Sequence, residues 1–268
     1  MTLIEHTMDN GIARIVLNRP DKKNAIDTRM WAELERALGD VRRSPDVRVL
    51  VLSAAGNDFC VGADLSSAEA SGNELGVSHR TQLERMQWIN SVVLSLRALK
   101  IPTIARVDGL AVGIGMNLAM CCDFVVASER ARFSEIFIRR ALTVDGGGSW
   151  LLPRLAGIRQ AKRLCMLGEM VSADEALRLG LVTAVTDVEA LDGAVETLVG
   201  KLVSHSRTAL AQTKSLLDDA YDSTFEQSLD SEARVQSLNV AGDDFKAAVA
   251  AFTTKSATPA TNTEVAGG

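Results

Sequence analysis

The sequence predicts an α/β fold followed by an all-helical C-terminal region. Short apolar runs typical of buried strands alternate with helical apolar patterns as far as about residue 200. From Val188 onward the remaining patterns are helical. Alternating strands and helices are typical of an α/β core. We therefore assign residues 1–200 to this core, residues 201–254 to a helical region, and the small, polar residues 255–268 to a disordered tail.

The first 60 residues predict two strands, a helix and a third strand. Apolar residues alternate from Ile4 to Val16 around Asn10-Gly11, which is typical of a hairpin. After a loop over residues 18–26, Asp27 can cap a helix whose apolar residues recur on one face. The run from Val47 to Ser53 predicts a buried strand.

Capping patterns predict where the later helices begin. Thr81 with Glu84, Ser172 with Glu175 and Thr224 with Gln227 each have the spacing of a capping box. Further helices are expected around Trp150, over residues 160–167 and around residues 245–252. Strands are expected at residues 103–107, 124–127 and 181–185, and the polar residues 66–80, which include His79, predict a mobile loop.

The central stretch from Val107 to Asp123 places glycines at the junction of a strand and a helix, which we expect over residues 116–122. Gly109, Gly113 and Gly115 precede or open this helix, whose first N–H groups are unpaired and could bind an oxyanion. The alternative is that the glycines only allow close packing. A second glycine loop, Phe59 to Leu65, also follows a strand, and the two loops could converge on one oxygen and stabilise an enolate.

Composition argues against several classes of protein. A net charge of −5 without a basic cluster disfavours nucleic acid as a partner, and no apolar run approaches the roughly 18 residues that span a bilayer. No leader pattern is present, so we expect a cytoplasmic protein. The four cysteines are expected to be buried thiols. Three scattered histidines make a metal site unlikely in this pattern, so a carboxylate is the expected acid–base group.

Three segments together resemble the crotonase family, the enoyl-CoA hydratases and isomerases. They are residues 59–65, residues 107–123 and the segment FSEIFIRRALTVDGGGSWLLPRLAG from Phe133 to Gly157, and SADEALRLGLV from Ser172 fits the same pattern. The resemblance covers about residues 3–254. It implies a spiral of strand-strand-helix repeats, a C-terminal helical region that builds homotrimers or dimers of trimers, and acyl-CoA thioester substrates. Coenzyme A is then part of the substrate, and no separate cofactor is implied.

The resemblance also implies roles for individual residues. The N–H groups of Ala63 and Ile114 match the oxyanion hole for the thioester carbonyl. The residues that match CoA-binding positions are Lys22, Asn24, Ala25, Cys60, Val61, Gly62, Asp64, Leu65, Phe245 and Lys246. Asp64 is expected to order its own loop or to meet CoA.

Two positions depart from the pattern of the family's hydratases. Those enzymes carry one glutamate just after the central glycines and a second twenty residues later, and these positions are Asn117 and Phe137 here. Asp145 follows eight residues later and matches the lone catalytic aspartate of the ring-1,2-epoxyphenylacetyl-CoA isomerase subgroup. Holding and splitting a water molecule needs both carboxylates, whereas one base is enough to move a proton between carbons.

The surroundings of Asp145 support this role on physical grounds. Phe137 and Trp150 would leave its carboxylate poorly solvated and raise its pKa, which makes it a better base. An aspartate before glycines is also a common turn or cap residue, so that interpretation stays open. Asn117 is expected to be a helix residue packed near the pocket. Glu135 is expected to point away as a solvated or salt-bridged residue, and the arginines at 139 and 140 to lie at the surface.

The sequence therefore predicts an enoyl-CoA isomerase that uses Asp145 as base and acid. An enoyl-CoA hydratase or an acyl-CoA hydrolase in which Asp145 activates water is the alternative within enzymes. A crotonase homologue that binds acyl-CoA without catalysis is the alternative outside them, since both usual glutamates are absent.

Overall fold

The computed structural model describes residues 2–64 and 81–256. Contacts divide the chain into two units, residues 1–204 and residues 205–268. The predicted mobile loop at 66–80, with His79, and the end of the predicted tail lie outside the described residues.

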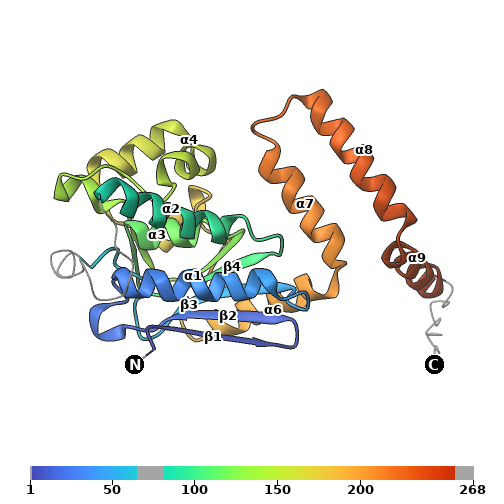
Figure 1. Cartoon of the computed structure of the whole chain (residues 1–268), viewed down its shortest axis with the longest axis horizontal. Coiled ribbons are helices and arrows are strands. Elements are labelled where there is room, and N and C mark those ends of the chain that lie inside the picture. The colour runs from blue at the N-terminus through green and yellow to red at the C-terminus, as the bar shows by residue number, and fades with distance from the viewer. Residues whose placement is uncertain (1, 65–80, 257–268) are drawn as a thin grey trace, which may run out of the picture. The chain divides into compact units, whose positions relative to one another are not determined.

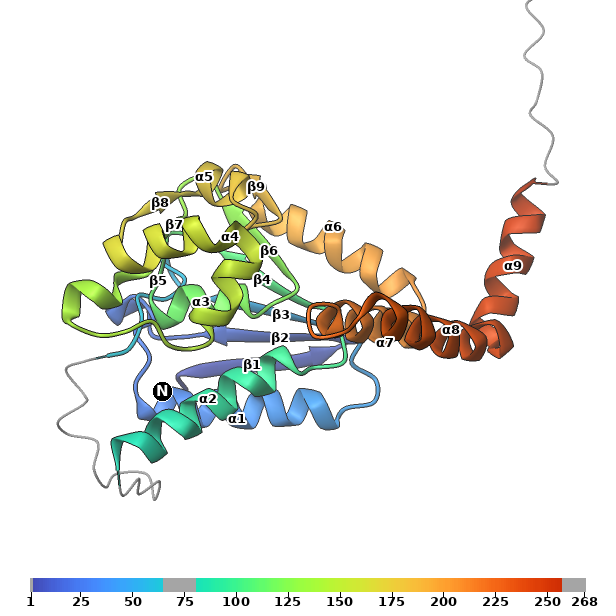
Figure 2. The ribbon, with the colours of Figure 1, turned by 90° about the horizontal axis from the view of Figure 1, so that it is seen from above.

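The first unit contains a six-stranded sheet in the order β1-β2-β3-β4-β6-β9. Its strands are β1 (Ile4–Asp9), β2 (Ile12–Leu17), β3 (Val49–Ala54), β4 (Thr103–Val107), β6 (Phe124–Ser128) and β9 (Ala184–Thr186). Only β1 and β2 pair antiparallel, and Asn10 and Gly11 between them have positive φ, as the hairpin pattern predicted. The other strands are parallel. Figure 1 shows α1 lying across the sheet, and Figure 2 shows α6 on its other side.

Six α-helices and two 3-10 helices accompany this sheet in the described part of the first unit. They are η1 (Pro20–Lys22), α1 (Thr28–Arg43), α2 (Gln82–Arg97), α3 (Ile114–Met120), η2 (Ile136–Arg140), α4 (Gly148–Leu167), α5 (Ala173–Arg178) and α6 (Leu191–Ser204). The predicted cap of α1 is confirmed, because Asp27 accepts a hydrogen bond of 2.8 Å from the Met30 N–H. The Thr81–Glu84 box at the start of α2 is also confirmed.

A second sheet, β5-β7-β8, consists of short strands that the periodicity did not predict. They are β5 (Leu110–Val112), β7 (Arg132–Ser134) and β8 (Val171–Ser172). In Figure 2 these strands lie together beside α4. Two single bridges, Ile26 with Ala63 and Cys60 with Ala111, bring further segments alongside this layer.

The order of strands and helices repeats along the chain. The order β4, β5, α3 is followed by β6, β7, α4, so each repeat gives one strand to the large sheet and one to the small sheet before its helix. In the two earlier repeats, β2 with α1 and β3 with α2, the second strand is reduced to a bridge at Ile26 or Cys60. This arrangement confirms the spiral of strand-strand-helix repeats.

Two local predictions need correction. The strand expected at 181–185 begins only at Ala184, because Leu181 and Val182 are buried ahead of it after the left-handed Gly180 ends α5. Ser172 caps α5 as expected, but the Glu175 carboxylate pairs with Arg163 instead of completing a box. By contrast, the two helices expected around Trp150 and at 160–167 are both present, since α4 is divided by a non-helical kink at Gly157, whose φ is 77°.

The second unit contains three helices in its described part. They are α7 (Arg207–Asp219), α8 (Phe225–Ala241) and α9 (Asp243–Ser256). The Thr224–Gln227 box caps α8 as predicted. Ser206, which caps α7, also donates a hydrogen bond of 2.5 Å to Asp244 at the start of α9, so the ends of these two helices are joined.

Candidate active site

The two glycine loops lie side by side because their backbones pair. The Cys60 N–H donates to the Leu110 carbonyl at 2.9 Å, and the Val112 N–H donates to the Cys60 carbonyl at 2.8 Å. Gly115 allows this approach, since a Cβ there would lie 2.4 Å from the Cys60 carbonyl oxygen. Close packing is therefore one function of the central glycines. The same packing brings the ends of the two loops together.

Ala63 and Ile114 line one pocket of about 350 Å³. Ile114 is the first residue of α3, where N–H groups have no partner within the helix and the dipole favours negative charge. Among the described residues, neither N–H donates a hydrogen bond to a loop, cap or side-chain acceptor. The other lining residues are Ala25, Val61, Gly62, Asp64, Leu110, Val112, Gly113, Ile136, Phe137, Arg140, Leu142 and Met170.

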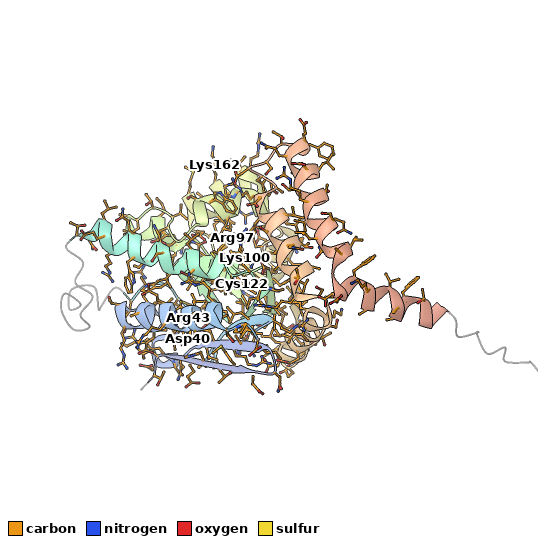
Figure 3. All side chains as sticks on the ribbon, turned by 45° about the vertical axis from the view of Figure 1, so that its right-hand side comes forward. Asp40, Arg43, Arg97, Lys100, Cys122 and Lys162 are labelled. Atoms are coloured by element: carbon orange, nitrogen blue, oxygen red, sulfur yellow. The ribbon has the colours of Figure 1, made fainter. Side chains whose placement is uncertain are left out.

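Asp145 and Trp150 line a second pocket of about 620 Å³. Its wall includes one face of α2, which ends at Arg97, a residue labelled in Figure 3. The remaining lining residues are Asn90, Val93, Leu94, Cys121, Val144, Gly146, Gly147, Ser149 and Leu151. The two pockets adjoin at Ile114, since a Cβ on Gly146 would lie 2.0 Å from the Ile114 Cδ1 atom.

Burial raises the pKa of the Asp145 carboxyl to about 6. Its Oδ1 atom is buried and has no hydrogen-bond partner among the described residues. Trp150 shares its pocket, as expected, and the indole ring stacks under the Arg154 guanidinium at 3.9 Å. Phe137 lines the other pocket, so the structure does not place both aromatic rings around Asp145.

Asn117 connects α3 to the loop that carries Asp145. Its side-chain N–H donates to the Asp145 backbone carbonyl at 2.8 Å, and the residue is fully buried. A Cβ on Gly148 would lie 2.7 Å from the Asn117 Nδ2 atom, so the amide is tightly enclosed. Asn117 lies near the pocket, as expected, and fixes the position of the Asp145 backbone.

The prediction for Glu135 is wrong. Its side chain is fully buried, and one carboxyl oxygen lies 3.5 Å from the Asn117 Nδ2 atom. Burial raises the pKa of Glu135 to about 8, with the Asp145 charge raising it further and Asn117 lowering it. The signal was available in the sequence: a period of two through the strand that contains Phe133 turns Glu135 to the same buried side.

Lys22, Asn24 and Ala25, which match CoA-binding positions, have different surroundings. Ala25 lines the smaller pocket, and Lys22 is exposed. Asn24 is buried, since its amide donates to the carbonyls of Ala55 and Asp58 at 2.9 and 2.7 Å. The Asn24 side chain therefore holds two loops together.

The described part of the second segment matched to CoA binding, residues 60–64, runs alongside these residues. The Ile26 N–H donates to the Gly62 carbonyl at 2.8 Å, and the Asp64 N–H donates to the Ile26 carbonyl at 2.9 Å. Asp64 also pairs with Arg19 at 2.8 Å, so it orders its loop. Cys60 is buried, and its backbone is hydrogen-bonded to β5, whereas Val61, Gly62 and Asp64 line the pocket.

Three further residues were matched to CoA-binding positions. Leu65 is outside the described residues. Phe245 and Lys246 belong to α9 of the second unit, where Lys246 pairs with Asp243 at 2.9 Å. The sequence pattern in turn did not select Arg97 or Arg140 as pocket residues, because arginines near helix ends are common at surfaces.

Three further features of the described residues concern metal ligands, thiols and membrane spans. No group of three or more His, Cys, Asp or Glu side chains within residues 2–64 and 81–256 is arranged to hold a metal ion. The four cysteines are free thiols, three of them buried. Of the helices described, none has the length and apolar character needed to cross a membrane.

Comparison with known proteins gives consistent matches over almost the whole chain. The profile of the enoyl-CoA hydratase/isomerase family matches residues 7–261. The 1,2-epoxyphenylacetyl-CoA isomerase of Escherichia coli (strain K12) is 34% identical, covering 95% of this chain and 97% of the relative. The crotonyl-CoA hydratase of Syntrophomonas wolfei is 31% identical, covering 92% and 93%. The crystal structure of a Mycobacterium smegmatis enoyl-CoA hydratase matches with a TM-score of 0.86 and 32% identity, over 95% of this chain and 97% of that one.

Proposed function

The chain belongs to the enoyl-CoA hydratase/isomerase family, and we propose that within this family it is an enoyl-CoA isomerase with Asp145 as its base and acid. The observation that carries the proposal is the environment of Asp145. It is the only acid among the described residues lining the larger pocket, and burial raises its pKa to about 6. A carboxylate with this pKa is ionised at neutral pH and is a stronger base than an ordinary aspartate.

The proposed reaction moves a double bond along the acyl chain. The thioester carbonyl lies in the smaller pocket, where the N–H groups of Ala63 and Ile114 donate to its oxygen. The acyl chain extends past Ile114 into the larger pocket, which adjoins at this residue. The Asp145 carboxylate takes a proton from C2 of a 3-enoyl-CoA, which leaves a dienolate, and returns the proton at C4 to give the 2-enoyl-CoA.

The two N–H groups and the carboxylate have separate tasks in this reaction. Removing a proton beside a thioester leaves negative charge on the carbonyl oxygen, and two positioned N–H donors stabilise that charge. One carboxyl group takes the proton, exchanges it with solvent and returns a proton to carbon, so no second carboxylate is required to activate water. The E. coli relative bears the name of an isomerase, which agrees with this assignment, whereas the S. wolfei relative bears the name of a hydratase.

Coenzyme A is proposed to bind along the paired segments at residues 22–26 and 61–64. Ala25, Val61, Gly62 and Asp64 line the pocket, and exposed Lys22 supplies a cation for a phosphate. Cys60 and Asn24 contribute by holding these segments together. Contacts from Phe245 and Lys246 to CoA remain part of the proposal.

We also propose that the protein is a homotrimer or a dimer of trimers. The described helices of the second unit expose many large apolar side chains, which are costly to leave in water. The most exposed are Leu217, Tyr221, Phe225, Leu238 and Phe252, at 66–80% of their full area.

The experiment that tests the isomerase assignment follows protons by NMR in heavy water. Wild type, Asp145→Asn and a control, Asp187→Asn, which changes an exposed aspartate outside both pockets, are each given a 3-enoyl-CoA and a 2-enoyl-CoA. We expect deuterium at C2 and C4 and a moved double bond with wild type and the control. Loss of the carboxylate should slow turnover by about 10²–10⁴-fold.

Other outcomes identify the alternatives. Turnover that survives in Asp145→Asn contradicts the mechanism. Solvent oxygen in the product identifies a hydratase or hydrolase, and binding of both compounds without change identifies a protein that binds acyl-CoA without catalysis.

A further inference from the structure

Glu135 is a buried acid that the proposed reaction does not use. It lies between β7 and η2 and is fully buried. Its Oε1 atom has no hydrogen-bond partner among the described residues, and its Oε2 atom lies 3.5 Å from the Asn117 Nδ2 atom. It lines neither of the two described pockets. A carboxylate in such a place is poorly stabilised, so the neutral acid is favoured.

Three groups outside η2 interact electrostatically or by hydrogen bonding with Glu135. Asn117 of α3 lowers its pKa, whereas the charge of Asp145, before α4, raises it. On α4, burial raises the pKa of the Cys165 thiol to about 11, and Glu135 raises it further. None of the described groups that affect the pKa of Glu135 is a cation.

As the pH rises, Asp145 therefore ionises before Glu135. The pKa of Asp145 is about 6 and that of Glu135 is about 8. Asp145 loses its proton first, and its negative charge then helps to keep Glu135 protonated. At neutral pH the pair holds one negative charge, on the acid that faces the larger pocket.

Asn117 joins Glu135 to the backbone of Asp145. Its amide N–H donates to the Asp145 carbonyl at 2.8 Å, and the same nitrogen faces Glu135. A negative charge on Glu135 would thus repel the Asp145 carboxylate through space. It would also attract the Asn117 amide, which holds the Asp145 loop.

We propose that Glu135 is a positioning residue whose proton sets the upper pH limit of the Asp145-dependent reaction. This inference rests on the proposed function. When Glu135 loses its proton to solvent, a second buried negative charge lies near Asp145 and attracts the Asn117 amide away from the Asp145 backbone that it holds in place. Activity should then fall as the pH rises through the pKa of Glu135.

The first test is the pH profile of kcat/KM for wild type, Glu135→Gln and the control Glu129→Gln, each normalised to its own maximum. Glutamine keeps the shape of the side chain and cannot ionise, and Glu129 is exposed. We expect wild type and the control to rise through about pH 6 and to fall by about fivefold between pH 8 and pH 9. The fall should be absent in Glu135→Gln. An unchanged fall in this variant would overturn the inference.

A second test does not depend on catalysis and compares thermal unfolding across pH. The folded pKa of Glu135 is above the ordinary value of 4.5, so its contribution to stability is fully present below that value and is lost as the pH rises towards about 8. Glu135→Gln should therefore gain in melting temperature relative to wild type between pH 5 and pH 8. Parallel melting curves would mean that Glu135 is not a buried neutral acid.

Asp145→Asn separates the two proposals. Without the charge of Asp145 the pKa of Glu135 should fall, so the stability change assigned to Glu135 should end at a lower pH than in wild type. If Asp145→Asn retains turnover while this shift appears, the proposed function fails and the coupling of the two acids stands. If Asp145→Asn is inactive and the shift is absent, the inference about Glu135 fails alone.

Discussion

Gly115→Ala tests whether the packing of the two glycine loops is required for both stability and activity. The added Cβ would lie 2.4 Å from the Cys60 carbonyl oxygen and 2.7 Å from its Cβ and Sγ atoms, where ordinary contacts are 3.4–4 Å. Cys60 is fully buried, and its carbonyl accepts the Val112 N–H. Backbone must therefore move by roughly an ångström before the methyl group fits.

The cost of this clash is large for a single methyl group. Overpacking a well-packed core costs roughly 1–3 kcal/mol, and we expect the upper part of this range because backbone has to give way. For a chain of this size each kcal/mol lowers the melting temperature by roughly 2–4 °C, so the expected fall is about 4–12 °C. Displacing Cys60 also moves the loop that carries Ala63, so turnover should fall by about tenfold or more.

Gly200→Ala is the matched control for thermal unfolding and turnover. Gly200 lies in α6, is exposed, and a Cβ there meets nothing within 4 Å. Alanine should stabilise this helix by about 0.8–1 kcal/mol relative to glycine and leave turnover unchanged. If Gly115→Ala melts at or above the temperature of wild type, the loops are not packed as described and the argument is wrong.

Three further predictions concern other parts of the chain. Burial raises the pKa of Asp108, but hydrogen bonds from Arg130 and Ser128 outweigh it, so the pKa is lowered overall. The Asp108 carboxylate therefore stabilises the fold above about pH 3.9, and this stabilisation is lost as the pH falls through the lowered pKa. Asp108→Asn should accordingly lower the melting temperature at pH 7, and this difference should shrink as the pH falls below about 3.9. Thr224→Ala removes one bond of a capping box and should cost about 1 kcal/mol, measured by denaturant unfolding. Sedimentation of the full chain should give a trimer or hexamer that Phe225→Asp weakens, and a monomer at micromolar concentration would contradict the proposed assembly.

The sequence predicted the large sheet and most helices because these elements carry long periodic signals. The hairpin at Asn10-Gly11 and the caps at Asp27 and Thr81 all agree with the structure. The small sheet was missed for a physical reason. Its strands have two or three residues, and the bridge at Cys60 has one on each side, so no period of two can be seen. The sequence of a loop that contains glycines does not show whether its backbone pairs with a neighbouring segment.

The candidate site was only partly accessible to sequence reasoning. That Ala63 and Ile114 share a pocket depends on the pairing at Cys60, which no local pattern encodes. The raised pKa of Asp145 was expected from its apolar neighbours, but the separation of Phe137 from Trp150 into two pockets depends on tertiary packing. Glu135 was missed although the period of two through Phe133 indicated its buried direction.

The two positions that differ from the pattern of the family's hydratases both have a structural task in this site. Asn117 holds the backbone carbonyl of Asp145 at 2.8 Å, which a carboxylate could not do because it has no N–H to donate. Phe137 packs against the turn that starts α3, since its Cζ atom would lie 3.4 Å from a Cβ on Gly113. Restoring one glutamate at 117 would therefore remove the donor that fixes Asp145 and add a third acid beside Glu135. Exchange between a two-carboxylate and a one-carboxylate site in this chain thus requires coordinated changes at 117 and 135 as well as at 137, because the Asn117 amide both faces Glu135 and holds the Asp145 backbone.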